Sequence, residues 1–167
     1  AASSDGAASS DGVTWSPNTV TSGDYYMKVH ANYDPDGDEV YCDQDGGYPS
    51  CRRPDNKKNE AKYEFRQNAD GTYKIYGYER GKWCRIPEYQ DDDVAKNNYA
   101  SIKCDGDQIS KGDDFDIYEN GNRIKIKSNI SSLGPGFCKQ INAKPGSFYQ
   151  KCNYSETDAS EYIIESI

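Results

Sequence analysis

Residues 104–121 have the sequence CDGDQISKGDDFDIYENG, which combines a cysteine, an alternating strand and a tight-turn signal. Eleven residues after Cys104, Phe115 starts a stretch in which apolar and polar side chains alternate. Alternation with a period of two is typical of a half-buried strand. Asn120-Gly121 then supplies the positive φ that a tight hairpin needs. The segment therefore predicts two antiparallel strands joined by a tight turn.

The same pattern occurs three times along the chain. Alternating strands start at Tyr63, Phe115 and Tyr162, and a cysteine precedes them by twelve, eleven and ten residues. Repetition at about fifty residues predicts three equivalent units, here of four strands each. In the first unit we expect strands at 25–29, 39–42 and 49–52, a first strand near 13–15, and closure of the ring by 161–167. The sequence thus predicts one all-β domain over 13–167, with about twelve strands and units near 13–62, 63–114 and 115–167.

The six cysteines fall two to a unit. Six cysteines allow fifteen pairings, and the repeat selects one disulfide per unit: Cys42–Cys51, Cys84–Cys104 and Cys138–Cys152. No C-x-x-C pair is present and His30 is the single histidine, so zinc ligation through sulfur is not expected. Three disulfides indicate an oxidising compartment. The N-x-[ST] sequons at Asn129 and Asn153 agree with a secreted glycoprotein.

Residues 1–12 consist of AASSDG written twice. Small and polar residues of this kind bury nothing, so we expect a flexible low-complexity tail. The chain begins without Met and without an apolar segment, which favours a mature secreted chain whose signal peptide has been removed.

Composition narrows the classes of function. Asp and Glu number 28 against 20 Lys and Arg, and the net charge of −8 argues against nucleic-acid binding. No stretch approaches the roughly 18 apolar residues of a membrane span. One histidine and the absence of any pattern that activates a nucleophile predict a non-catalytic protein. Fifteen Tyr, four Phe and two Trp offset the hydrophobic share of only 34% and favour a folded core.

Three four-stranded units with a cysteine pair each, an aromatic strand about ten residues after the second cysteine and a following Asp-Gly or Asn-Gly turn resemble the β-trefoil. Within that fold they resemble the ricin-B type of lectin repeat, over residues 24–167 and best at 104–121. The resemblance implies a carbohydrate- or glycoconjugate-binding module. The family's Q-x-W signature is absent. Its sugar-binding Asp, two residues after the first cysteine, is replaced by Gln44, Ile86 and Gln140.

The opening Gly23-Asp24-Tyr25-Tyr26 also resembles the Kunitz soybean-trypsin-inhibitor type, another trefoil. This second resemblance implies protease binding through the loop between the fourth and fifth strands, here 52–60. That loop carries the basic residues that suit a trypsin-like pocket: Arg52, Arg53, Lys57 and Lys58. Trefoils also serve as protein-interaction or structural subunits of larger extracellular assemblies, and fold alone does not choose between these functions.

Two groups of residues are candidate ligand sites. Tyrosines near the loop 87–98 present flat rings beside hydrogen-bonding groups and suit a polar ligand: Tyr76, Tyr78, Tyr89 and Tyr99. Trp15 and Trp83 are further aromatic residues that could stack on a sugar ring, although Trp83 adjoins Cys84 on a strand and is expected to pack against the disulfide. Carboxylates at alternate positions of an acidic turn can bind one Ca²⁺ through oxygen: Asp34, Asp36, Asp38 and Glu39.

Overall fold

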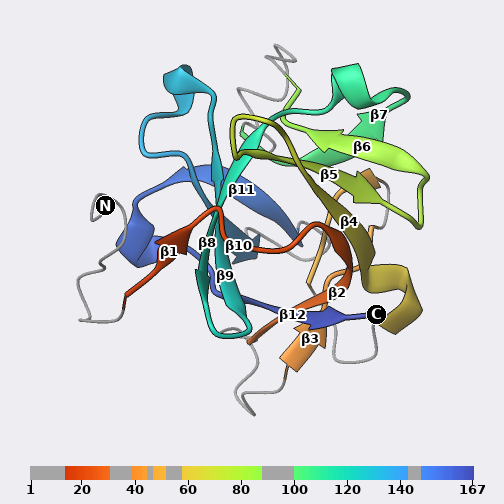
Figure 1. The fold of residues 1–167 in the computed structure, drawn as a ribbon, viewed down its shortest axis with the longest axis horizontal. Coiled ribbons are helices and arrows are strands. Elements are labelled where there is room, and N and C mark those ends of the chain that lie inside the picture. Colours follow the sequence, from red (N-terminus) through yellow and green to blue (C-terminus); the bar gives the residue numbers. More distant parts are fainter. Residues whose placement is uncertain (1–13, 31–38, 45–46, 52–57, 88–99, 143–147) are drawn as a thin grey trace.

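The fold is all-β. The computed structural model describes residues 14–30, 39–44, 47–51, 58–87, 100–142 and 148–167. These residues form twelve strands and several short 3-10 turns, and they contain no α-helix (Figure 1). Accordingly, no helix in these ranges is long and apolar enough to span a bilayer.

Six strands close into an antiparallel ring. They are β2 (Gly23–His30), β4 (Lys62–Gln67), β5 (Tyr73–Gly77), β8 (Phe115–Asn120), β9 (Arg123–Ser128) and β12 (Tyr162–Ser166). Each pairs with the next in that order, and β12 pairs back to β2. Closure of a sheet on itself removes the exposed edges that an open sheet presents.

A hairpin lies between the two ring strands of each third of the barrel. The second and third hairpins are β6 (Lys82–Arg85) with β7 (Lys103–Gly106), and β10 (Phe137–Asn142) with β11 (Phe148–Tyr154). In the first, β3 (Glu39–Tyr41) is followed by a bridge between Asp43 and Ser50 in place of the strand expected at 49–52. The hairpins meet one another, because Ile102 donates its N–H to the Gln150 carbonyl at 3.0 Å.

Each hairpin carries one disulfide, with the partners that the repeat predicts: Cys42–Cys51, Cys84–Cys104 and Cys138–Cys152. In the second and third hairpins the bonded cysteines lie directly opposite one another in the ladder. The side chains of all six cysteines are buried. Disulfides of this kind are typical of an oxidising, extracellular-type compartment.

The ring repeats the same register three times. The residues that the sequence repeat aligns stand opposite equivalent positions, as Tyr63 with Gly77, Phe115 with Ser128, and Tyr162 with Val29. Two residues further on, the opposed pairs are Phe65 with Ile75, Ile117 with Ile126, and Ile164 with Met27. The spacing found in the sequence is therefore a spatial repeat of the barrel wall.

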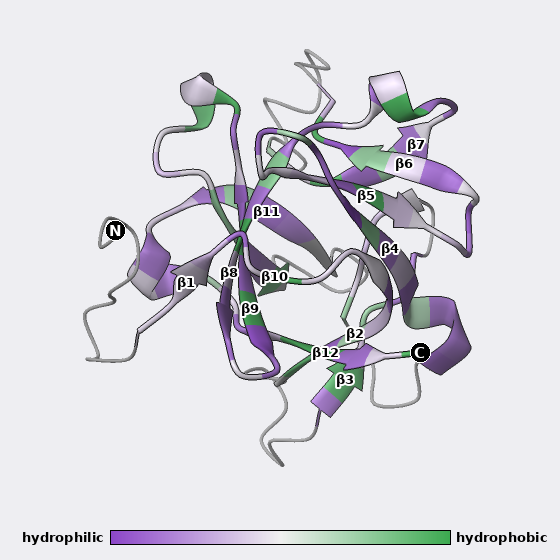
Figure 2. Ribbon diagram, in the orientation of Figure 1, coloured by the Kyte–Doolittle hydropathy of each residue, from purple (hydrophilic) through white to green (hydrophobic). Residues whose placement is uncertain are grey.

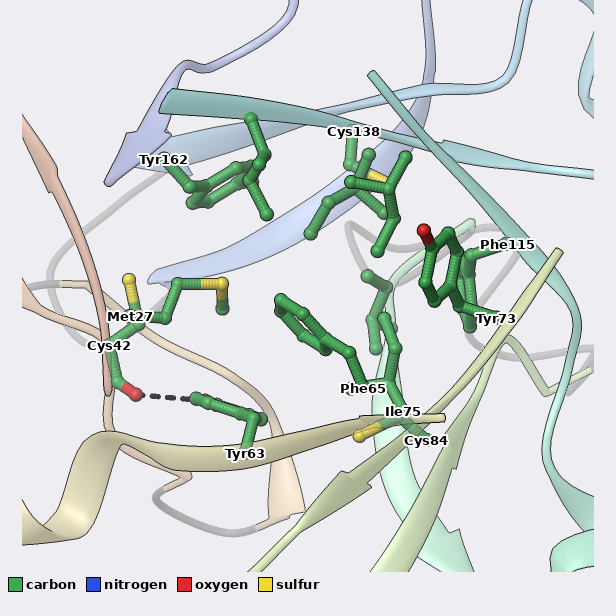
Figure 3. Close-up of a cluster of buried hydrophobic side chains, with 14 of the residues drawn as sticks. Met27, Cys42, Tyr63, Phe65, Tyr73, Ile75, Cys84, Phe115, Cys138 and Tyr162 are labelled. Atoms are coloured by element: carbon green, nitrogen blue, oxygen red, sulfur yellow. Dashed lines mark hydrogen bonds between the residues drawn. The ribbon is translucent and has the colours of Figure 1, made fainter. Parts of the chain in front are cut away.

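The core fills the ring with aromatic and aliphatic side chains (Figure 3). Along the ring strands, hydrophilic and hydrophobic residues follow one another at short intervals (Figure 2), as expected for strands with one face inside. Tyr63 is fully buried, and its hydroxyl donates to the Cys42 carbonyl at 2.8 Å. That bond links the second ring strand to the first hairpin, and it removes the cost of burying a phenol.

The strand expected near 13–15 begins one residue beyond that stretch, as β1 (Ser16–Pro17), and Val13 lies outside the described residues. β1 lies outside the ring and pairs with β8. The ring is closed by β12, as predicted for 161–167, and β12 pairs with β2 through five residue pairs. Pro17 suits the place of β1 outside the ring, since a residue without an N–H cannot hold a central place in a ladder.

Candidate ligand-binding face

Tyr76 and Tyr78, two of the four predicted tyrosines, lie together outside the barrel. Side chains of a strand alternate between its two faces, and in β5 Tyr73 and Ile75 are buried. Tyr76 therefore faces outward, and Tyr78, just after the strand, is 37% exposed. Residues two positions apart in a strand lie on the same face, so Tyr76 and Tyr78 are expected on the same side of the sheet.

Trp83 of β6 completes a row of three rings, which we call the aromatic ridge (Tyr76, Tyr78 and Trp83). Tyr76 stands opposite Trp83 in the ladder. The Tyr76 centroid lies 5.1 Å from that of Tyr78 and 5.0 Å from that of Trp83, both in edge-to-face geometry. Such pairs contribute beyond their buried area. The rings of the ridge are thus held by one another.

Cations lie over both outer rings of the ridge. The Lys62 ammonium is 4.4 Å from the centroid of Tyr78, and the Arg66 guanidinium is 5.1 Å from that of Trp83. Arg66 also donates from Nε to Oε2 of Glu64 at 2.9 Å. Both cations come from β4, whose outward positions alternate with buried Tyr63 and Phe65. The ridge therefore holds positive charge at fixed places beside its rings.

A hydrogen bond fixes the exposed end of the ridge. The Tyr78 hydroxyl donates to Oδ1 of Asp24 at 2.8 Å. Partial burial and this carboxylate raise the pKa of Tyr78 to about 12, so the phenol stays protonated at neutral pH. Asp24 and Glu64 are both partly exposed, and Glu64 stands opposite Tyr76 in the ladder. Ring edges, a hydroxyl, carboxylates and cations together can bind a polar ligand that has apolar patches.

Cation–aromatic contacts are a general feature of this surface. Eight occur among the described residues: Lys28–Tyr41, Lys58–Tyr26, Lys62–Tyr78, Arg66–Trp83, Lys103–Tyr48, Lys125–Trp15, Lys127–Phe137 and Lys139–Tyr154. Folded proteins contain roughly one strong pair per 70–80 residues. One such contact is therefore not by itself a sign of a site, and the ridge is distinguished by its three contacting rings.

Among the described residues, the two equivalent faces of the barrel have fewer ring–ring contacts, namely Phe137 with Tyr118 at 5.4 Å on the third face. An aromatic residue precedes the first cysteine of every hairpin, as Tyr41, Trp83 and Phe137. Where the second face has Tyr76 against Trp83, the first has Lys28 over Tyr41 and the third has Lys127 over Phe137. This aromatic–Cys dipeptide is the sequence signal that marks the three equivalent faces.

The remaining aromatic candidates do not join the ridge. Trp15 is 1% exposed, with the Lys125 ammonium over its ring, so it is not available to stack on a sugar. Trp83, which belongs to the ridge, is only 8% exposed and has Arg66 over its ring. Tyr89 and Tyr99 lie outside the described residues.

The predicted calcium turn is described only at its end. Asp34, Asp36 and Asp38 lie outside the described residues, and Glu39 forms an ion pair with Lys28 at 2.7 Å. No group of three or more metal-ligating side chains occurs in the part of the chain that the structure describes. Calcium binding stays a prediction about residues 34–39.

The basic loop is described only from Lys58 onward; Arg52, Arg53 and Lys57 lie outside the described residues. Lys58 begins the 3-10 turn η2 (Lys58–Ala61). Its ammonium lies 3.2 Å from Glu165 and 4.8 Å from the Tyr26 centroid. Lys58 is therefore held against the barrel by two contacts.

The positions that hold the sugar-binding Asp in ricin-type repeats serve packing in this chain. Gln44 is fully buried, and its side-chain amide donates to the Lys62 carbonyl at 3.2 Å. Ile86 is buried, and Gln140 accepts the Cys51 N–H at 3.1 Å. These side chains attach hairpins to neighbouring parts of the fold.

Of the two sequon residues, Asn129 is exposed and Asn153 is partly exposed in β11.

No protein-family model matches the chain, and no curated protein is significantly similar to it.

Proposed function

We propose that the protein is a β-trefoil that binds carbohydrate or glycoconjugate through the aromatic ridge, without catalysing a reaction. The observation that carries the proposal is the row of Tyr76, Tyr78 and Trp83, bordered by Asp24, Glu64 and two cations. Sugars present both C–H patches and hydroxyl groups. A surface that combines rings with hydrogen-bonding groups meets both needs.

The threefold register supports the trefoil part of the proposal. A six-stranded ring with one hairpin inserted per third, repeated in the same register, is the arrangement that the resemblance implies. Each hairpin is cross-linked by one of the three disulfides. They also support a place in a secreted or otherwise oxidising environment.

A glycan array tests the binding part. The full chain should bind a subset of glycans, and the double substitution Tyr76→Ala with Tyr78→Ala should abolish that signal. Tyr154→Ala is the matched control, because Tyr154 is a partly exposed tyrosine beneath a lysine, Lys139, at 5.2 Å. Equal signals for the ridge variant and the control would refute the ridge as the binding face.

A protein partner is the second candidate. Tyr, Trp and Arg are enriched among the residues that dominate protein interfaces. The ridge and the adjacent Arg66, whose side chain is 51% exposed, bring all three types together. A blank array, together with a stoichiometric partner whose capture is lost in Arg66→Ala, would favour this candidate. Protease inhibition through 52–60 is a weaker proposal, tested by trypsin inhibition in Arg52→Ala and Arg53→Ala.

A further inference from the structure

One junction between neighbouring strands of the barrel has very few residue pairs. Among the three equivalent junctions, β2 pairs with β4 through four residue pairs and β9 pairs with β12 through two. The third junction, between β5 and β8, has a single pair, Tyr73 with Phe115. Beyond Phe115, the side of β8 that faces β5 needs another partner for its backbone groups. An unpaired strand edge of this kind readily accepts an added strand.

An N-terminal segment, residues 14–20, supplies that partner, and we call it the strap. Its two-residue strand pairs Ser16 with Glu119 and Pro17 with Tyr118 (Figure 1). Asn18 continues the ladder in a different way, because its N–H donates to the Ile117 carbonyl at 2.6 Å and its Oδ1 accepts the Ile117 N–H at 2.9 Å. Asn18 has a φ of 55°, a conformation that asparagine tolerates better than most residues.

Side chains anchor the strap at both ends. Trp15 is 1% exposed, and the Lys125 ammonium lies 4.7 Å from the centroid of its ring. Val20 is 2% exposed, and its carbonyl accepts the hydroxyl of Tyr73 at 2.6 Å. The acceptor surface therefore fits an extended segment with an aromatic residue at one end and a β-branched residue at the other.

The backbone pairing of the strap is short, and side chains supply the rest of its attachment. Its ladder spans only the residues that face Ile117–Glu119. Asn18 donates from its side-chain amide to Asp116, Thr19 donates to Glu119, and the Asn18 carbonyl accepts from the Gln67 amide. The strap is joined to β2 by Thr21 and Ser22, which are both exposed, and the Ser22 hydroxyl accepts the Gln67 N–H. At its Trp15 end, Nε1 of Trp15 and Oε2 of Glu156 are buried without a hydrogen-bond partner among the described residues. Segments held by few backbone ladder bonds open locally before the rest of a fold.

We infer that the β5-facing edge of β8 is a strand-acceptor site, and that its second occupant is the strap of another copy of this chain. Another copy carries the identical segment, so every contact described for the strap can be remade between two molecules. Exchange of an identical element between protomers is a low-cost route to dimers. The exposed link at Thr21 and Ser22 is the hinge that would change direction.

A trans-binding experiment tests the inference on the full chain. The probe is a fluorescent synthetic peptide of residues 13–22, measured by anisotropy. Trp15→Ala weakens the strap and leaves the acceptor edge intact, so this variant should bind the peptide at least tenfold more tightly than the unmodified chain. In the unmodified chain the attached strap competes at high effective concentration. A peptide carrying Trp15→Ala should not bind, and Tyr154→Ala should match the unmodified chain.

Asn18→Ala provides a second weakened strap if Trp15→Ala lowers the yield of folded protein. Hydrogen exchange of the unmodified chain gives an independent measurement, in which the Ile117 amide should exchange faster than the amide of Ile126. Absence of peptide binding to folded weakened-strap variants would overturn the inference. Exchange of Ile117 only with global unfolding would overturn it as well.

Discussion

The Tyr78 hydroxyl donates a 2.8 Å hydrogen bond to Asp24, although the two residues are 54 positions apart in the chain. Asp24 belongs to β2 and Tyr78 follows β5, and both strands flank β4 in the ring. The bond therefore spans β4 and fixes the exposed end of the aromatic ridge. It makes the geometry of the proposed binding face depend on the pairing of β2 with β4.

Tyr78→Phe removes this bond and keeps the ring. A typical intramolecular hydrogen bond contributes about 1 kcal/mol, so we expect glycan affinity to fall by roughly three- to tenfold through loss of ring positioning. Calorimetric titration with a glycan identified on the array measures the change. Tyr154→Phe is the control, and an unchanged affinity in Tyr78→Phe would show that the bond does not support binding.

The side chain of Gln44 fills the space beside Gly77 and leaves no room for a Cβ there. A Cβ on Gly77 would lie 2.8 Å from Cδ of Gln44 and still closer to its amide oxygen. Gly77→Ala should therefore lower the free energy of unfolding by about 1–3 kcal/mol through overpacking. In the background Gln44→Ala the same change should cost clearly less, since the obstructing amide is gone. Urea denaturation of the four proteins measures the coupling, and strict additivity would contradict the contact.

The disulfides should contribute unequally. Their sequence separations are 9, 14 and 20 residues. In the chain-entropy account a longer closed loop gives more stabilisation, about 3 kcal/mol at these lengths. Replacing both cysteines of Cys84–Cys104 by alanine should thus lower the free energy of unfolding more than the same change at Cys42–Cys51. Denaturant titration gives the order, and the reverse order would show that native-state packing dominates.

Glu165 should contribute to stability near neutral pH. Hydrogen bonds from Lys28 and Lys58 lower its pKa from the ordinary value of 4.5. A carboxyl whose pKa is lower in the folded state stabilises the fold above its unfolded pKa, and this contribution is lost as pH falls through the folded pKa. Glu165→Gln should therefore cost about 1 kcal/mol or less at pH 7, since the side chain is partly exposed, and nothing at acidic pH well below 4.5. Equal costs at both pH values, measured by urea denaturation, would exclude the ion pairs as the cause.

Sequence periodicity was enough to predict the all-β class, the strand pairs around the turns and the cysteine partners. Gly121 and Gly71 have φ of 64° and 94°, as the Asn-Gly and Asp-Gly signals predicted. The same reasoning placed the first strand near 13–15 rather than at Ser16–Pro17, because a short local pattern carries no information about which strand edge it meets. β1 can pair with β8 because β5 and β8 share only one residue pair, which leaves the edge of β8 open. That open edge is a property of the closed barrel and not of the local sequence.

The residues of the candidate site, too, were only partly predictable from the sequence. Tyr76 and Tyr78 were predictable from strand alternation and from their place in the second unit. Lys62 and Arg66 lie on β4, the hairpin partner of β5, so their closeness to the ridge also follows from the predicted turn. Asp24 was not predictable, because β2 lies near Tyr78 only through its pairing with β4. The aromatic residue before each first cysteine was visible in the sequence, and recognising its repetition would have identified Trp83 as part of the face.

Nuclear magnetic resonance titration tests the proposed binding face most directly. A glycan identified on the array is added to isotope-labelled full-length protein, and the backbone amides and both indole N–H signals are followed. We expect saturable shifts at Tyr76, Tyr78 and the indole of Trp83, with the indole of buried Trp15 and the amide of Tyr154 unchanged. Saturable shifts confined to other parts of the barrel, with the ridge signals unmoved, would contradict carbohydrate binding at the aromatic ridge.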